Sequence, residues 1–175
     1  APMAWNVADD FDLVVYNRSE EPTEAFADAG VPVAETPRGV SERADVTVVM
    51  VTDGDALRDV LDGTNGLLAG LAAGDYVVNS STVSPDDTEA AAALIAEADG
   101  RFVDCPVSGT VGPAEAGTLT MLAGGADADV DAVEGVLKTM GDPVVRCGGV
   151  GDGTHAKLSV NLLLGDMMQS FAESL

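Results

Sequence analysis

Lys157 and Asn161 are the two residues whose types and spacing most directly suggest chemistry. They lie four residues apart in "GDGTHAKLSVN" (151–161), and the lysine is one of only two in a chain with 30 carboxylates. In a helix, residues at i and i+4 are neighbours on one face. The two polar groups therefore project together and form a candidate site on one face of a helix. The alternative is a solvated lysine on an ordinary helix.

The residues around Lys157 predict a buried helix. Apolar side chains surround the helix on nearly every side when successive residues are spaced by about 100°. They are Leu158, Val160, Leu162, Leu163 and Leu164. This pattern is typical of a buried helix, and Met167 and Met168 are also expected in the core.

A second candidate for chemistry is the turn "PVSG" (106–109), which follows a predicted strand. The hydroxyl of Ser108 and the backbone N–H groups around Gly109 can face an anion. A turn without a ligand is the alternative for this motif when it is considered alone.

The elements that must position these residues alternate along the chain. Apolar runs predict strands over 12–17, 45–51, 75–81, 101–107, 118–125 and 143–148. Helices are predicted over 21–30, 54–63, 84–100 and 129–141, after a first helix in "APMAWNV" (1–7) and before a continuous helix from Thr154 onward. This alternation predicts an α/β fold with a parallel sheet covered on both faces.

Ligands of such sheets bind beyond the carboxyl ends of the parallel strands. Two strand ends, "MVTD" (50–53) and "SST" (80–82), are therefore expected to face a ligand. "GGVGDG" (148–153) has the glycine spacing of a dinucleotide-binding turn, but no βαβ unit fits between it and residue 175. We therefore predict a loop that leads into the Lys157 helix.

The composition excludes several classes of partner. The net charge of −22 and the pI near 4.1 argue against nucleic acid, which the chain would repel. The acids are scattered along the whole sequence, as in proteins of salt-loving organisms, whose carboxylate surfaces keep them soluble in concentrated salt. An ordinary acidic cytosolic protein is the alternative. The longest apolar runs fall short of the roughly 20 residues that span a bilayer, so no membrane partner is expected.

Neither the acidic segments nor the cysteines match a known metal-binding pattern. "DADVD" (127–131) resembles the start of a calcium loop but lacks the glycine and glutamate that such a loop requires, so no metal is expected. Cys105 and Cys147 are far apart in sequence and have no zinc-ligand spacing. Two isolated cysteines fit a reducing cytoplasm.

Five blocks of the sequence together resemble the 3-hydroxyisobutyrate dehydrogenase or β-hydroxyacid dehydrogenase family, with 6-phosphogluconate dehydrogenase as a more distant relative. The blocks are "PMAWN" (2–6), "VYNRS" (15–19), "NSSTVSP" (79–85), "DCPVSGTVGPAEAGTLTMLAGG" (104–125) and "GDGTHAKLSVN" (151–161). The resemblance implies an NAD(P)-dependent oxidoreductase that transfers hydride between a nicotinamide and a small hydroxy acid. It also implies a Rossmann-like, mostly parallel sheet with helices on both faces.

The same resemblance implies how the chain is organised. Residues 1–152 are expected to form the NAD(P)-binding domain, and residues 153–175 to begin an interdomain helix that leads to an all-helical C-terminal domain outside this chain. The family's first strand and its G-x-G-x-x-G turn are expected before Ala1, so the chain is expected to be truncated at both ends. A homo-oligomer formed through the C-terminal domain is expected as well.

The resemblance also assigns cofactor contacts. They fall on Pro2, Met3, Asn17, Arg18, Ser19, Val51, Thr52, Ser81 and Thr82. Residues 17–19 are expected beside the adenosine ribose, where an arginine suits the 2′-phosphate of NADP and an acid would suit NAD. NADP is therefore preferred over NAD. The alternative is that Arg18 is only a solvated side chain of a surface loop. Thr52 stands where the family often has proline.

On the substrate side, the resemblance makes Lys157 the general acid/base and Asn161 a hydrogen-bonding partner of the substrate. Ser108, Gly109 and Thr110 are expected at the substrate carboxylate, with Thr110 in place of a usual second glycine. Two alternatives remain open: a non-catalytic nucleotide-binding or structural remnant of the family, and a decarboxylating enzyme like 6-phosphogluconate dehydrogenase.

Overall fold

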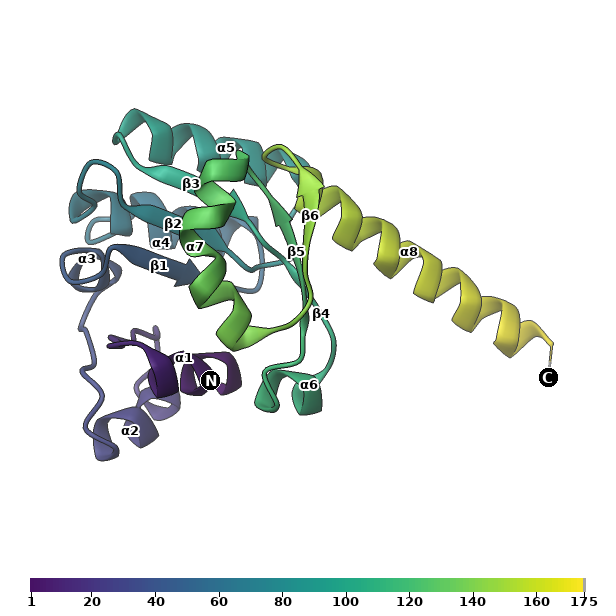
Figure 1. Ribbon diagram of the computed structural model, residues 1–175, viewed down its shortest axis with the longest axis horizontal. Helices are drawn as coiled ribbons and strands as arrows, with labels where there is room; N and C mark the ends of the chain where they lie inside the picture. The colour runs from purple at the N-terminus through teal and green to yellow at the C-terminus, as the bar shows by residue number, and fades with distance from the viewer. Residues whose placement is uncertain (175) are drawn as a thin grey trace.

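A six-stranded mixed sheet forms the centre of the molecule (Figure 1). The computed structural model describes residues 1–174. The strands are β1 (Val46–Val49), β2 (Tyr76–Asn79), β3 (Arg101–Asp104), β4 (Val107–Ser108), β5 (Thr120–Gly124) and β6 (Val144–Gly148). They lie in the order β1-β2-β3-β5-β4, and β6 also pairs with β5.

The sheet is mostly parallel, as predicted, but it contains a reversal. Strands β1, β2 and β3 are parallel, whereas β5 runs antiparallel to both β3 and β4, and β6 is parallel to β5. The reversal follows from the short connection between β4 and β5, because a parallel crossover needs a dozen or more residues. That connection holds a single short helix, α6 (Val111–Glu115).

Helices cover both faces of the sheet, as the alternating pattern predicts. In addition to α6, the helices of residues 1–174 are α1 (Pro2–Asp10), α2 (Glu21–Asp28), α3 (Pro37–Ser41), α4 (Gly54–Asp62), η1 (Leu67–Ala69), α5 (Pro85–Glu97), α7 (Asp127–Met140) and α8 (Asp152–Glu173). The side chains of Asp53 and Ser84 cap α4 and α5, respectively, by accepting hydrogen bonds from backbone N–H groups of the first turn.

Alternation along the strands divides the core into two clusters. In β2, Val77 packs into the cluster under α4 and α5, and its neighbour Val78 packs into the cluster under α1 and α7. Phe102 and Val103 of β3 divide in the same way. Because successive side chains of a strand point to opposite faces, both layers of helices are held by the same short strands.

The predicted strand over residues 12–17 is wrong. Within the part of the chain that the structure describes, this segment takes part in one isolated bridge, between Val15 and Val33. The Val15 N–H donates to the Pro32 carbonyl at 3.0 Å, and the Val15 carbonyl accepts from the Ala34 N–H at 2.8 Å. An apolar run becomes a strand only where a partner supplies repeated pairing, and here the pairing stops after one residue.

The prediction that the Lys157 helix is buried is also wrong for this chain. Helix α8 extends away from the rest of the molecule (Figure 1), with Leu162 67% and Met168 74% exposed. Apolar side chains do surround the helix, but its buried residues, Gly153 and Thr154, are confined to the first turn. Met167 and Met168 are therefore outside the core.

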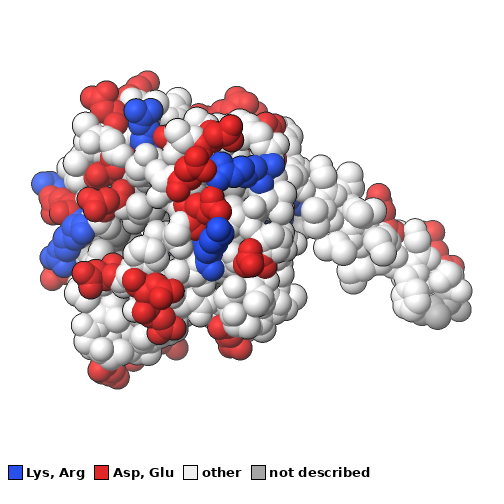
Figure 2. Space-filling model, viewed as in Figure 1, with Lys and Arg blue, Asp and Glu red and all other residues white. Residues whose placement is uncertain are grey.

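The surface reflects the composition. On the face shown in Figure 2, Asp and Glu side chains are spread over the sheet-and-helix body, whereas the surface of α8 is largely uncharged. Among the helices of residues 1–174, none has the combination of length and apolar character that crossing a bilayer demands.

Candidate functional site

The carboxyl ends of the three parallel strands lie side by side. Val49, Asn79 and Asp104, the last residues of β1, β2 and β3, are paired in register. The segments that follow these strands therefore emerge along one edge of the sheet. This is the edge at which ligands of such sheets bind.

Two of the residues assigned to the cofactor are directly joined at this edge. The Val51 N–H donates to the Ser81 hydroxyl at 2.9 Å, and the Ser81 N–H donates to the side-chain oxygen of Asn79 at 3.1 Å. Ser81 is buried, whereas Thr52 and Thr82 beside it are exposed. The structure thus brings residues 51–52 and 81–82 together and leaves two threonine side chains facing outward.

Two buried polar atoms at the end of β2 lack a partner within residues 1–174. They are the side-chain nitrogen of Asn79 and the hydroxyl of Ser80, whose residues are at most 1% exposed. Buried polar groups nearly always find a hydrogen-bond partner. Both groups are therefore available to a ligand or to water at this edge.

Residues 17–19 form an exposed turn near the same edge. The Asn17 side-chain amide donates to the carbonyl and to the hydroxyl of Ser19, each at 3.0 Å. Arg18 lies near the Asp53 carboxylate. The pKa of Asp53 is lowered mainly by the N–H of Ala56, further by the Thr52 hydroxyl, and to a smaller extent by the charge of Arg18.

Pro2 and Met3 begin helix α1. Both are half-buried, and the Met3 side chain packs against the core cluster under α1 and α7. The helix itself contacts α6 and α7. Met3 therefore contributes to packing in this chain, and its cofactor contact stays a prediction.

The "PVSG" turn lies at the end of β4. Ser108 is half-buried and pairs with Thr120. Gly109 has φ +148°, and a Cβ atom there would lie 2.6 Å from a Leu119 methyl group, so the turn requires glycine. Thr110 has an extended backbone, with φ −118°, which any residue can adopt. Threonine in place of a second glycine therefore leaves the turn unstrained.

Lys157 and Asn161 lie on the first turns of α8. Lys157 is half-buried and Asn161 is exposed. The helix contacts β3, β5, β6 and α5. The predicted loop over 148–153 is shorter than expected: Gly148 ends β6, residues 149–151 connect it to α8, and Gly151 is the N-cap of the helix.

Asp104 is a site residue that sequence reasoning missed. It is fully buried, and its two carboxylate oxygens accept hydrogen bonds from the N–H groups of Gly151 and Thr154, both at 2.7 Å. Burial raises the pKa of the Asp104 carboxyl, although these two hydrogen bonds oppose the increase. The available signal was an acid in the apolar strand "RFVDCPV" (101–107), where a charge needs partners.

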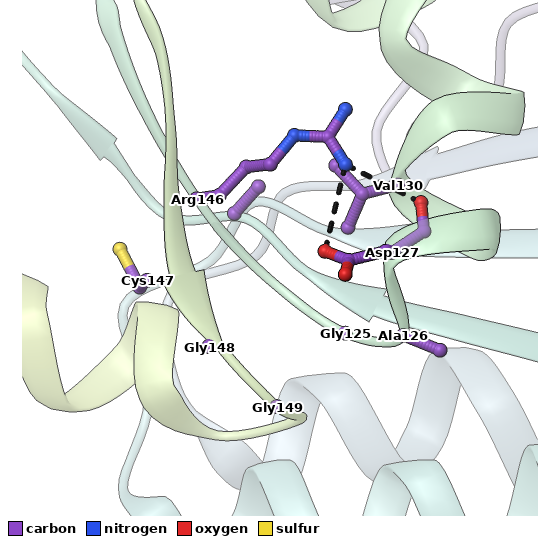
Figure 3. A pocket seen from close by; sticks show the side chains of 9 residues that line it. Gly125, Ala126, Asp127, Val130, Arg146, Cys147, Gly148 and Gly149 are labelled. Atoms are coloured by element: carbon purple, nitrogen blue, oxygen red, sulfur yellow. Dashed lines mark hydrogen bonds and ion pairs between the residues drawn. The ribbon is translucent and has the colours of Figure 1, made fainter.

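A cavity of about 480 Å³ lies elsewhere, between α7 and β6 (Figure 3). Its lining includes Arg146, which forms ion pairs with Asp127, Asp131 and Glu134 of α7. None of its lining residues is among those assigned to cofactor or substrate.

The segment that resembles a calcium loop, residues 127–131, lies within helix α7. Residues 1–174 contain no group of three or more His, Cys, Asp or Glu side chains that could hold a metal ion.

Known proteins resemble this chain in fold and in sequence. Mouse mitochondrial 3-hydroxyisobutyrate dehydrogenase is 35% identical over 175 residues, covering 99% of this chain and 52% of the mouse protein. The solved structure of Mycobacterium tuberculosis 3-hydroxyisobutyrate dehydrogenase with L-serine matches with a TM-score of 0.92 and 27% identity, covering 99% of this chain and 59% of that one. Psf3 in complex with NADP+ and 2-OPP matches with a TM-score of 0.87 and 26% identity, covering 99% and 65%.

The chain spans about half the length of the curated relatives it matches. The family model described as the NAD binding domain of 6-phosphogluconate dehydrogenase matches residues 1–149, which end just before α8. The chain therefore belongs to the family of the 6-phosphogluconate dehydrogenase NAD binding domain.

Proposed function

We propose that the protein containing this chain transfers hydride between a nicotinamide cofactor and a small hydroxy acid similar to 3-hydroxyisobutyrate. One observation carries the proposal: the helix that bears Lys157 begins against the carboxyl end of β3, on the same edge as residues 51–52 and 81–82. The names of the mouse and M. tuberculosis relatives support a hydroxy acid as the substrate.

In this proposal the polar residues of α8 act on the substrate hydroxyl. Lys157 accepts the hydroxyl proton in the direction of oxidation and returns it in the direction of reduction. Asn161, one turn further along, donates a hydrogen bond to the substrate. Ser108, Gly109 and Thr110 bind its carboxylate through a hydroxyl and backbone N–H groups.

The cofactor supplies or accepts the hydride, and several features of the chain fit it. Asn79 and Ser80 at the end of β2 have buried polar atoms that find no partner among residues 1–174, and Thr52 and Thr82 are exposed beside them. Pro2, Met3, Val51 and Ser81 are assigned to the same cofactor. They complete its binding edge in this proposal.

NADP is the proposed cofactor in preference to NAD. Arg18, flanked by Asn17 and Ser19, lies in an exposed turn, where its guanidinium suits a 2′-phosphate. The NADP+ complex of Psf3 supports this choice. The neighbouring carboxylate of Asp53 argues against this choice, because its negative charge partly offsets the positive charge of Arg18.

Residues 1–152 are proposed as the cofactor-binding domain, and residues 153–175 as the start of a helix shared with a further domain. The exposed apolar surface of α8 supports this division, because such a surface is normally covered. We propose that the further domain covers α8 and also forms a homo-oligomer.

Substitution of Lys157 in the full-length gene product tests the function. We expect Lys157→Ala to lower kcat by about 10²–10⁴-fold, the usual contribution of a general acid/base, and to leave the Kd for NADP unchanged. Lys138→Ala is the matched control, because Lys138 lies on α7 and is paired with Glu134 on the surface. Activity of Lys157→Ala within tenfold of the parent would contradict the assigned role.

Substrate assays on the full-length gene product distinguish the proposed dehydrogenase from the decarboxylating enzyme and from the non-catalytic remnant. Hydroxyisobutyrate, glycerate, hydroxybutyrate and 6-phosphogluconate are offered with NADP and with NAD, and carbon dioxide release is followed in parallel. Release from 6-phosphogluconate would identify a decarboxylating enzyme, and absence of both turnover and cofactor binding would identify a remnant. Arg18→Ala should weaken NADP binding but not NAD binding. Equal affinity of the parent for both cofactors would refute the NADP preference.

A further inference from the structure

Asp104 provides the cap that the N-terminus of α8 lacks. The N-cap residue of α8 is Gly151, which has no side chain and has φ +92°. Both oxygens of Asp104 instead accept from N–H groups of the first turn, those of Gly151 and Thr154. A carboxylate from the end of β3 thus replaces the capping side chain that usually comes from the helix itself.

Two glycines allow α8 to approach Asp104 this closely. A Cβ atom at Gly153 would lie 2.3 Å from the Leu122 carbonyl oxygen and 2.9 Å from an Asp104 carboxylate oxygen. A Cβ atom at Gly124 would lie 2.5 Å from the other carboxylate oxygen. The first turn of α8 therefore rests directly on the ends of β3 and β5.

The main chain of Asp104 leads into the segment that carries Ser108. The next residue, Cys105, donates its N–H to the Asn79 carbonyl at 2.7 Å, and the Pro106 carbonyl accepts from the Leu122 N–H at 3.0 Å. These bonds fix the segment from β3 to β4 on the sheet. Asp104 therefore connects to Ser108 through its backbone and to the helix of Lys157 through its side chain.

We propose that Asp104 is a positioning residue for proton transfer, which holds Lys157 in a fixed place relative to Ser108. The inference rests on the proposed acid/base role of Lys157, located one turn beyond Thr154. Asp104 acts through the helix and does not touch the substrate. Misplacement of a catalytic group by about 1 Å is enough to reduce turnover about 100-fold.

The substitution Asp104→Asn in the full-length gene product tests the inference, because it replaces one acceptor oxygen with a donor. We expect kcat to fall about 10- to 100-fold, with the Kd for NADP unchanged. Leu61→Ala, a fully buried position in the cluster under α4 and α5, controls for loss of stability. At a temperature where both variants are folded, Leu61→Ala should keep its kcat.

A double-mutant cycle with Lys157→Ala separates positioning from general weakening. If Asp104 acts through Lys157, Asp104→Asn should change kcat by less than about twofold when Lys157 is already absent, because residues that act as a unit are not additive. The inference is overturned if Asp104→Asn loses the same factor in both backgrounds, or keeps the kcat of the parent.

Amide hydrogen exchange supplies a readout independent of turnover. Asp104→Asn should accelerate exchange at Gly151 or Thr154 more than Leu61→Ala does, because only the former leaves one of these two N–H groups without its acceptor oxygen. Unchanged exchange would overturn the anchoring itself. Full turnover of Lys157→Ala would instead overturn the proposed function, whatever the exchange data show, so the two failures are distinguishable.

Discussion

The hydroxyl of Thr154, in the first turn of α8, is hydrogen-bonded to the hydroxyl of Thr88 in α5, with 3.0 Å between the two oxygens. Both residues are at most 1% exposed. This bond is the second attachment of α8 to the sheet domain, after the carboxylate of Asp104. It joins the helix that carries Lys157 to a helix on one face of the sheet.

The Thr88–Thr154 bond is expected to show strong coupling in stability. Thr88→Val or Thr154→Val alone should each cost about 0.5–1.5 kcal/mol per lost hydrogen bond. Each removes the bond between the two hydroxyls, and Thr88→Val also removes the bond to the Ser84 carbonyl. The double variant should cost less than the sum by about 0.5–1.5 kcal/mol, because both polar groups are then gone. Urea unfolding measures the four free energies, and strict additivity would show that the hydroxyls are not bonded.

Three helices end on an exposed aspartate, and we expect these residues to destabilise the protein at low salt. Asp10, Asp28 and Asp62 are the last residues of α1, α2 and α4, where the helix dipole is negative. Their joint replacement by Asn should raise stability by about 0.3–1 kcal/mol per site. Thermal unfolding in dilute buffer measures the change.

A matched charge change gives the control. Asp55, Asp86 and Asp129 lie in the first turns of α4, α5 and α7, where a negative charge is favourable, so their replacement by Asn should lower stability.

For the parent, the net charge of −22 predicts a Tm that rises between about 0.1 M and 1 M KCl, as the screening length falls from about 10 Å to about 3 Å. A Tm that falls with salt would contradict the interpretation of a salt-adapted surface.

The apolar surface of α8 predicts that a substitution on it has different effects on stability in residues 1–175 alone and in the full-length gene product. In residues 1–175 alone, Leu162 is exposed, so Leu162→Ala should change stability by less than about 0.5 kcal/mol. In the full-length gene product we expect a loss of about 2–5 kcal/mol, as for a buried leucine. Denaturant unfolding of both proteins measures the difference. Equal, small effects would mean that α8 stays uncovered.

The two cysteines should react very differently with a thiol reagent. Burial raises the pKa of the Cys105 thiol to about 12, so almost no reactive thiolate forms at pH 8. Burial also raises the pKa of Cys147, but this residue is partly exposed. We expect one thiol per native chain to react with Ellman's reagent, faster as the pH rises, and a second only after unfolding.

Cys147→Ser identifies the thiol. This variant should show no rapid reaction, whereas Cys105→Ser should react like the parent. Two reactive thiols in the native protein would show that β3 opens in solution.

Much of the fold could be predicted because its signals are local. Asp53 and Ser84 cap α4 and α5 at positions where the sequence places an acceptor three residues before the N–H it binds. Val77 and Val78 lie on two buried faces because the strand is apolar throughout. Gly109 lies in a turn that only glycine fits.

The predictions fail where residues distant in sequence decide the structure. Residues 12–17 have the apolar pattern of a strand, but pairing depends on a neighbour that the pattern does not specify. The apolar surround of α8 indicates that the helix needs covering, and it does not indicate which part of a protein covers it. The bonds of Asp104 to Gly151 and Thr154 span 47 and 50 residues, a separation at which one sequence gives no signal of contact.

The capping of α8 by Asp104 also has a consequence for motion. Lys157 and Ser108 are separated by most of the second half of the chain, yet four residues lead from Ser108 back to Asp104, one hydrogen bond crosses to Thr154, and three residues lead on to Lys157. Because the path is short, we expect the separation of Lys157 and Ser108 to vary less than the position of the exposed end of α8.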